Sequence, residues 1–196
     1  MNNLKPMRDV FIEGITKKMM VNDNIFFLSA DFGSPALDNL RRKVKNRFIN
    51  VGIAEQNLIN IACGLALEGC ITYVYGIAPF ITMRCYEQIR NNLSMISQLR
   101  SINVNIISVG AGLSYDLSGP SHQCYEDISI IRTLPNIMLF SLSDNILVKK
   151  VVDLTVRVSS PKYIRLDGQP LPDIYYIKDN RINFNKGFYE LKKGKE

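Results

Sequence analysis

Residues 48–74, FINVGIAEQNLINIACGLALEGCITYV, predict the architecture of the chain. The segment begins with a short apolar run and ends with a second one at residues 71–74, and both have the composition of buried strands. Between them, apolar side chains recur every three or four residues over positions 55–67, the period of an amphipathic helix. Gly69 ends that helix, because glycine readily adopts the left-handed backbone found there. A strand, a helix and a strand in this order predict a parallel βαβ unit.

The same alternation continues on both sides of this unit. Further strands are expected at residues 25–30, 104–109, 137–140 and 163–166, and further helices at residues 9–21, 80–99, 125–133 and, after the N-cap Asp144, up to about 158. Strands that alternate with helices predict an α/β domain, a parallel sheet flanked by helices on both faces, over residues 1–172. The pattern weakens from Asp173, so residues 173–196 are expected to form a basic tail or linker.

The composition is that of an ordinary globular protein. Of 196 residues, 46% are apolar and 21% are charged, and the formal net charge is +6. No apolar run approaches the ~20 residues of a membrane-spanning helix, and the first residues lack the apolar centre of a secretion signal. Four cysteines without CxxC spacing and a single histidine argue against a zinc site. These features predict a cytoplasmic protein that holds no metal by itself and does not bind a membrane.

A basic run occupies residues 41–47, RRKVKNR, which hold five basic side chains and no acid. No stacking aromatics or known nucleic-acid module accompany it, so nucleic acid is not an expected partner. The run is interpreted as a solvated loop, and a docking surface for an acidic partner remains open.

Ligands of doubly wound sheets bind at the carboxyl ends of the strands, so the loops that follow the predicted strands are the place to look for a site. Three residues in these loops have alternative interpretations. Glu55 either offsets the dipole of the helix that it opens or acts as a carboxyl group in apolar surroundings. His122 is either a surface residue or a proton donor or acceptor, and Phe80 is either core or part of a binding site. The pair Gly110 and Gly112 only faintly resembles a dinucleotide loop, because the third glycine is missing.

Four ordered motifs resemble the central domain of transketolases and deoxyxylulose phosphate synthases. They are FINVGIAEQN at 48–57 with IACGLALEG at 61–69, YEQIR at 86–90, AGLS at 111–114 with SHQ at 121–123, and EDI at 126–128 with RTLPN at 132–136. Together they span most of residues 7–172. In that family the domain binds the pyrimidine part of thiamine diphosphate, and its fold is a parallel sheet flanked by helices.

The resemblance implies roles for four residues. Glu55 matches the catalytic glutamate that contacts the aminopyrimidine ring and takes part in activating the cofactor. Phe80 matches the aromatic residue that stacks on this ring. His122 matches a catalytic histidine that hydrogen-bonds oxygen atoms of the donor and the intermediate, and Asp31 matches an active-site acid in the first strand-end loop.

Other positions depart from the family pattern. Ile77 and Met83 stand in the cofactor pocket where the family has aromatic residues. Arg8 matches an arginine that contacts the substrate phosphate, whereas Ser118 replaces an aspartate that reads a donor hydroxyl. Arg165 is a further candidate for substrate binding.

Two glycines mark the remaining departures. Gly168, in the stretch 165–168 (RLDG), stands where the family has an arginine for the substrate phosphate. Gly110 stands where the family has a histidine. A site that loses arginine holds phosphate less well, so a modified or nucleotide-linked sugar is the hypothesis for the substrate.

The chain contains no Gly-Asp-Gly…Asn stretch of the kind that holds Mg²⁺ and the cofactor diphosphate in this family. The resemblance therefore implies a separate N-terminal, diphosphate-binding subunit, with Mg²⁺ ligated mainly by that partner. A dimer or a heterotetramer is expected, and residues 185–195 resemble the linker that enters the family's third domain.

The expected function is transfer of a two-carbon ketol or acyl unit between sugars, as the C-terminal subunit of a split transketolase. One alternative is a subunit of a synthase of the deoxyxylulose type, which decarboxylates an oxoacid. A second alternative is a catalytically degenerate subunit that serves only in assembly.

Overall fold

Within residues 4–175 and 182–187, which are the residues that the computed structural model describes, six strands form one parallel sheet. Their order is β2-β1-β3-β4-β6-β5. The strands are β1 (Ile25–Ser29), β2 (Phe48–Asn50), β3 (Ile71–Ile77), β4 (Asn103–Val109), β5 (Met138–Ser141) and β6 (Lys162–Leu166). The helices are α1 (Met7–Met19), α2 (Pro35–Val44), α3 (Glu55–Leu67), α4 (Ala78–Thr82), α5 (Tyr86–Gln88), α6 (Asp127–Ile131) and α7 (Asn145–Arg157). The predicted α/β class is confirmed.

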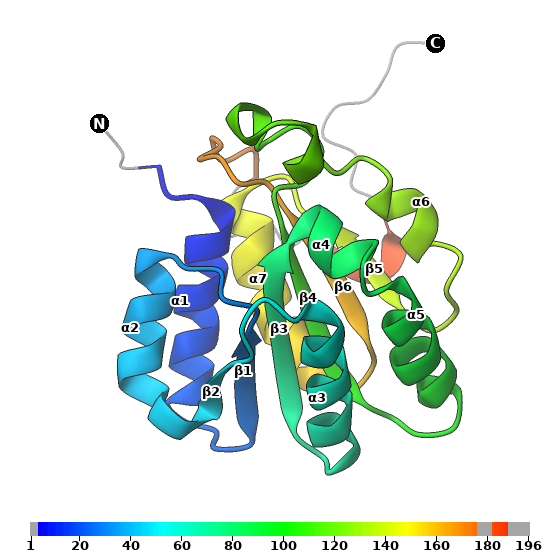
Figure 1. The fold of residues 1–196 in the computed structure, drawn as a ribbon. Coiled ribbons are helices and arrows are strands. Elements are labelled where there is room, and N and C mark those ends of the chain that lie inside the picture. Colours follow the sequence, from blue (N-terminus) through cyan, green and yellow to red (C-terminus); the bar gives the residue numbers. More distant parts are fainter. Residues whose placement is uncertain (1–3, 176–181, 188–196) are drawn as a thin grey trace.

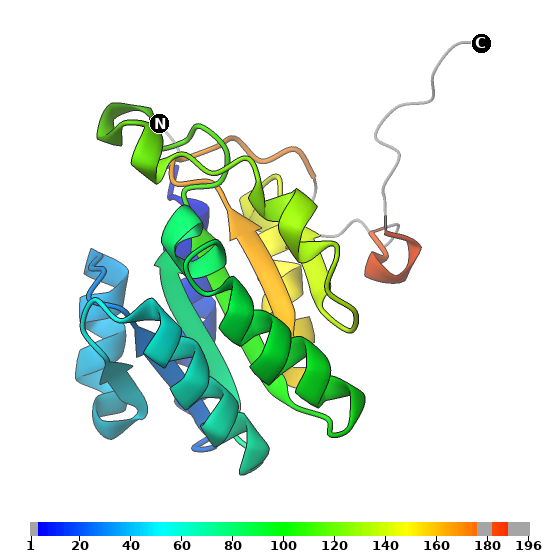
Figure 2. The same cartoon turned by 45° about the vertical axis from the view of Figure 1, so that its right-hand side comes forward.

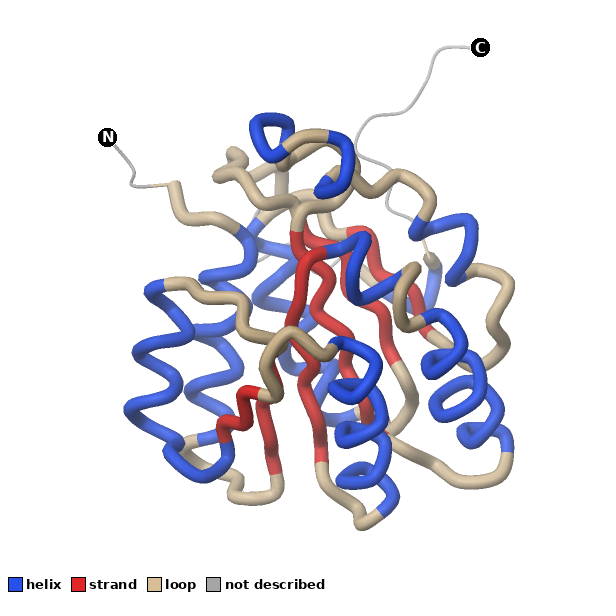
Figure 3. The backbone as a smooth tube through the Cα atoms, in the orientation of Figure 1, coloured by secondary structure: helices blue, strands red, loops and turns tan. Residues whose placement is uncertain are grey.

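The sheet separates two apolar cores. Helices α1, α2 and α7 cover one face, and α3, α4 and α5 cover the other with α6 beside them (Figures 1 and 2). Successive side chains of strand β3 point to opposite faces of the sheet and so contribute to both cores. Tyr73 and Tyr75 pack on the α1 side, whereas Val74 between them packs on the α3 side. All three are fully buried, as expected for a central strand of a parallel sheet. Figure 3 shows the strands running side by side, with the helices outside them.

Helix α2 was not predicted from the sequence. It begins after Ser34, whose hydroxyl group accepts a hydrogen bond from the backbone N–H of Leu37, and only Leu37, Leu40 and Val44 turn to the core. These three positions have the spacing of one helix face, but the segment is rich in charged residues and lacks an apolar run, so the sequence analysis did not predict the helix. The basic run at residues 41–47 is therefore not a loop: it lies on the end of α2 and the 3₁₀ turn that follows.

The single helix predicted over residues 80–99 is wrong in detail. The segment is divided into α4, α5, a π-helical turn at Ile89–Met95 and a 3₁₀ turn at Ile96–Gln98. The break between α4 and α5 directs Arg84 toward the beginning of α3, where it contacts Glu55. Apolar periodicity continues through the break and so could not reveal it.

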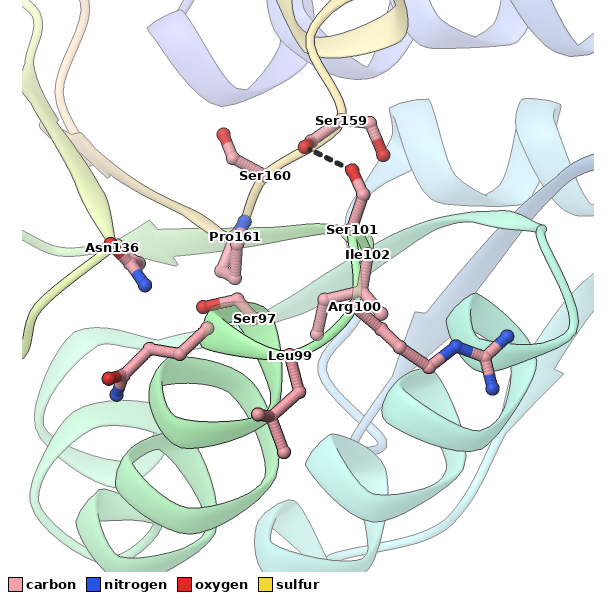
Figure 4. A pocket seen from close by; sticks show the side chains of 10 residues that line it. Ser97, Leu99, Arg100, Ser101, Ile102, Asn136, Ser159, Ser160 and Pro161 are labelled. Carbon is pink, nitrogen blue, oxygen red and sulfur yellow. Dashed lines mark hydrogen bonds between the residues drawn. The ribbon is translucent and has the colours of Figure 1, made fainter.

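A hollow of about 410 Å³ lies at the amino ends of β4 and β6. Figure 4 shows the serine-rich lining, in which the Ser101 hydroxyl group donates a hydrogen bond to the Ser159 carbonyl oxygen at 2.9 Å. Parallel sheets bind ligands at the opposite edge, and none of the candidate residues lines this hollow. It is not the candidate site.

Lys162, the first residue of β6, is buried next to this hollow. Its Nζ donates hydrogen bonds to Asn103 Oδ1 at 3.0 Å and to the carbonyl oxygens of Ser160 and Val158 at 2.8 and 2.5 Å. Burial lowers the pKa of Lys162 from 10.5 to about 7. Between these two values the unfolded chain binds more protons than the folded chain, so this group makes stability rise with pH.

We predict that the free energy of unfolding of the native chain, minus that of Lys162→Met, increases from about pH 7 to about pH 8.5. Urea denaturation at several pH values measures both quantities, and the difference cancels the groups that the two chains share. A difference that stays constant over this window would contradict the prediction.

Candidate active site

Glu55 is the first residue of α3, at the carboxyl edge of the sheet. Gly52, with a φ of 74°, lets the chain turn from the end of β2 into the helix. Although it is charged, the Glu55 side chain is only 5% exposed. Its place at a helix N-terminus favours the negative charge, but burial also requires a charged or hydrogen-bonding partner.

Arg84 provides that partner. Its Nη1 donates a hydrogen bond to Glu55 Oε2 at 2.7 Å, and its guanidinium group also lies over the ring of Phe80, 4.7 Å from the centroid. Gln56 donates a side-chain hydrogen bond to the Arg84 carbonyl oxygen at 3.1 Å. Arg84 thus joins the beginning of α3 to the end of α4. Sequence reasoning missed it because the predicted continuous helix hid the break in which it lies.

His122 completes a row of four side chains, in the order Glu55, Arg84, Phe80 and His122. Its ring meets that of Phe80 edge-on, with centroids 5.3 Å apart and planes at 69°. The Nδ1 atom of His122 is 3.1 Å from the hydroxyl oxygen of Ser121. Three residues predicted from the sequence are therefore brought together: Arg84 joins Glu55 to Phe80, and Phe80 contacts His122. A hollow of about 380 Å³ lies beside the row and is lined in part by Glu55 and Arg84.

Asp31 lies at the same edge of the sheet, just after β1. Asn50, at the end of β2, donates a hydrogen bond to Asp31 Oδ1 at 3.0 Å and accepts one from the Asp31 backbone N–H at 3.1 Å. The φ of Asp31 is 52°, a left-handed conformation that is uncommon outside glycine. Ile77 ends β3, and Met83, with 43% of its surface exposed, follows α4.

Of the four predicted substrate residues, His122 lies in this row and the other three lie outside it. Arg8, on the first turn of α1, donates hydrogen bonds to the Tyr115 hydroxyl oxygen at 3.4 Å and to Asp9 Oδ1 at 3.3 Å. Ser118 is exposed on a 3₁₀ turn of the loop after β4. Arg165, on β6, forms an ion pair with a buried acid. No hydrogen bond found within residues 4–175 joins these three residues to the row.

The buried acid that pairs with Arg165 is Asp127, on α6, whose side chain is fully buried. Its Oδ2 accepts hydrogen bonds from Arg165 Nε at 2.9 Å and from the Tyr163 hydroxyl group at 3.0 Å. The Tyr163 oxygen is also 2.9 Å from Thr82 Oγ1 and 2.6 Å from Ser108 Oγ. Burial raises the pKa of Tyr163 well above its usual value, so the phenol stays protonated and donates. This network links α4, β4, β6 and α6 beneath the candidate site.

The described residues contain no group of three or more His, Cys, Asp or Glu side chains that could hold a metal ion. None of the helices in the described part of the chain is long and apolar enough to span a bilayer.

The family model for the transketolase pyrimidine-binding domain matches residues 5–173. The chain belongs to the transketolase family. A putative transketolase C-terminal section of Methanocaldococcus jannaschii is 32% identical over 192 residues, covering 97% of this chain and 58% of that protein. An apulose-4-phosphate transketolase subunit of Actinobacillus succinogenes is 30% identical over 176 residues, covering 89% of this chain and 55% of that subunit.

Solved transketolase structures have the same fold as this chain. A split-gene transketolase, described as an inactive β4 tetramer, superposes with a TM-score of 0.81 at 30% identity and covers 97% of this chain and 60% of that one. Transketolase from Leishmania mexicana gives a TM-score of 0.72 at 18% identity over 84% of this chain and 25% of its own, which shows a shared fold. This chain thus spans little more than half the length of the transketolase subunits that it matches.

The transketolase family depends on thiamine diphosphate, and the row fits the pyrimidine part of this cofactor. A buried carboxylate offers a hydrogen-bond acceptor for a ring nitrogen, and the half-buried ring of Phe80 offers a flat apolar surface nearby.

Proposed function

We propose that this chain is the pyrimidine-binding subunit of a two-subunit, transketolase-like transferase. It would transfer a two-carbon ketol or acyl unit between sugars. The observation that carries the proposal is the row of Glu55, Phe80 and His122 at the carboxyl edge of a domain of the transketolase family. A buried carboxylate, an aromatic surface and an imidazole group supply the acid–base and stacking functions that such a transfer needs.

Each residue of the row has a separate task. Glu55 would hold the aminopyrimidine ring of thiamine diphosphate and move a proton at its ring nitrogen, while Arg84 keeps the carboxylate in place. Phe80 would support the flat ring, with Ile77, Met83 and Asp31 around it. His122 would donate hydrogen bonds to oxygen atoms of the sugar, and its exposed loop gives it access to them. When bound, the cofactor supplies the nucleophilic carbon that takes up the two-carbon unit.

A second chain is part of the proposal. The relatives are a C-terminal section and one subunit of a transketolase, and the split-gene structure is an inactive tetramer of one kind of chain. The partner would be an N-terminal subunit that binds the diphosphate group and ligates most of the Mg²⁺, in a cytoplasmic heterotetramer. Exposed apolar side chains near the row provide a surface for it: Ile53, Leu113 and Leu117 are 77%, 61% and 98% exposed.

Affinity capture tests this proposal. The chain, with thiamine diphosphate and Mg²⁺, is used as bait in extract of its native cells, and captured proteins are identified by mass spectrometry. We expect a partner with the Gly-Asp-Gly…Asn stretch, and two-carbon transfer when the two chains are mixed. Leu117→Asp should weaken capture, whereas Val21→Asp, at an 85% exposed position at the other end of the domain, should not. If the reconstituted pair transfers no two-carbon unit, the proposal fails.

The two alternatives receive less support. Preservation of the Glu55, Phe80 and His122 row argues against a degenerate assembly subunit. The two relatives described above carry transketolase names, and neither is named as a decarboxylating synthase. Release of CO₂ from an oxoacid by the reconstituted pair would revive the synthase alternative.

A further inference from the structure

The ring of Tyr115 fills a space that exists only because two neighbouring residues are glycines. Gly110 follows β4, and Gly168 lies two residues after β6. A Cβ atom placed on Gly110 would lie 2.3 Å from Cδ2 and Cε2 of Tyr115, and one placed on Gly168 would lie 2.6 Å from Cε1. Gly110 also has a φ of 91°, which disfavours any side chain there. Neither position can carry a larger residue while the ring stays in place.

The surrounding backbone holds this arrangement. The Gly168 N–H donates a hydrogen bond to Ser114 Oγ at 3.2 Å, and the Gln169 side-chain amide donates one to the Ser114 carbonyl oxygen at 3.1 Å. The N–H groups of Gly110 and Ala111 both donate to the Leu166 carbonyl oxygen at 3.1 Å. The loops after β4 and β6 are thereby fastened together around Tyr115. Figure 1 places both loops and the beginning of α1 at the same edge of the sheet as the candidate site.

Three arginines near this edge are paired with carboxylates. The hydroxyl oxygen of Tyr115 accepts a hydrogen bond from Arg8, whose Nε is 3.3 Å from Asp9 Oδ1. Arg84 and Arg165 are paired in the same way, with Glu55 at 2.7 Å and with Asp127 at 2.9 Å. Each of these three arginines has a carboxylate partner, so none of them offers an uncompensated charge to a phosphate dianion.

We propose that Tyr115 determines the substrate specificity of this site by excluding a terminal phosphate group. The substrate would be a sugar whose far end is neutral and bears hydroxyl groups, which the phenol and Arg8 meet with hydrogen bonds. The ring occupies the room that a phosphate-binding side chain at position 110 or 168 would need. This inference rests on the proposed function, because it assumes that a sugar reaches this edge of the sheet.

The first test uses the reconstituted two-subunit enzyme and one ketose supplied with and without a terminal phosphate. The native enzyme should favour the unphosphorylated ketose in kcat/KM. The double variant Tyr115→Ala/Gly168→Arg, in which the emptied space admits the arginine, should shift this preference toward the phosphate by ~10-fold or more. Tyr86→Phe removes the hydroxyl group of a tyrosine whose contact is Thr133, and it should leave the preference unchanged. A native enzyme that favours the phosphorylated ketose would overturn the proposal.

Two further measurements test the role of Tyr115 even if the double variant is unfolded or the enzyme is inactive. Tyr115→Phe keeps the ring and should raise KM for the neutral ketose with little change in kcat; an unchanged KM would contradict a role for the hydroxyl group. Titration of the chain alone with inorganic phosphate, followed by ³¹P NMR, should show tighter binding to the double variant than to the native chain. Equal binding would overturn the exclusion of phosphate. If the enzyme uses no sugar at all, the proposed function fails, and this titration still decides the role of Tyr115.

Discussion

Glu55→Gln is expected to reduce kcat of the reconstituted enzyme by roughly 10²–10⁴-fold, the usual contribution of a general acid or base. The side chain keeps its length and can still form hydrogen bonds, but it can no longer exchange a proton. Glu55 is buried at the beginning of α3, and the partner of its carboxylate is Arg84, a permanently charged group that cannot take over the proton exchange. Steady-state rates with saturating cofactor measure the effect, and thermal denaturation verifies that the variant is folded.

Glu68→Gln is the matched control. Glu68 caps the other end of α3 and its side chain is exposed, so its substitution should leave kcat unchanged. If Glu55→Gln retains the activity of this control, then Glu55 is not the proton-transfer group, and the degenerate-subunit alternative gains support.

Much of the fold follows from the sequence, since fully buried parallel strands appear as continuous apolar runs. The run at 104–109 corresponds to β4, and the strong stripe at 55–67 corresponds to α3 without adjustment. Asp144 caps α7 as predicted, with its side chain accepting a hydrogen bond from the Leu147 N–H. The errors concern α2, whose apolar face is hidden among charged residues, and the segment from Ala78 to Gln98, where apolar periodicity continues through the break.

Some residues of the candidate site could be predicted from the sequence, and others could not. Glu55, Phe80 and His122 were accessible from sequence because motifs and strand-end loops mark their positions. Arg84 and Tyr115 were not, because their importance depends on partners far away in the chain: Glu55 lies 29 residues before Arg84, and Arg8 lies 107 residues before Tyr115. No pattern of residue types records such contacts, although the glycines at 110 and 168 marked unusual positions.

Asp127→Ala is expected to destabilise the chain by about 3 kcal/mol, the lower end of the range for breaking a buried ion pair. The variant leaves the Arg165 guanidinium group, whose side chain is only 19% exposed, without its counter-charge. It also removes the acceptor of the Tyr163 hydroxyl group in an interior where the pKa of that phenol is raised by burial. The lower end applies because Arg165 keeps partial contact with water. Urea denaturation gives the free energy of unfolding directly.

Asp153→Ala provides the comparison. Asp153 is paired with Lys18, but their side chains are 58% and 38% exposed, so its loss should cost less than about 1 kcal/mol. Both substitutions remove one carboxylate and one ion pair, but only Asp127 is buried and also accepts a hydrogen bond from Tyr163. Equal effects on stability would mean that the network below the candidate site does not support the fold. A large effect of Asp127→Ala alone would support the ion pair between α6 and β6 as an anchor of the fold. This anchor lies at the end of the loop between β4 and α6, which carries His122 and Tyr115.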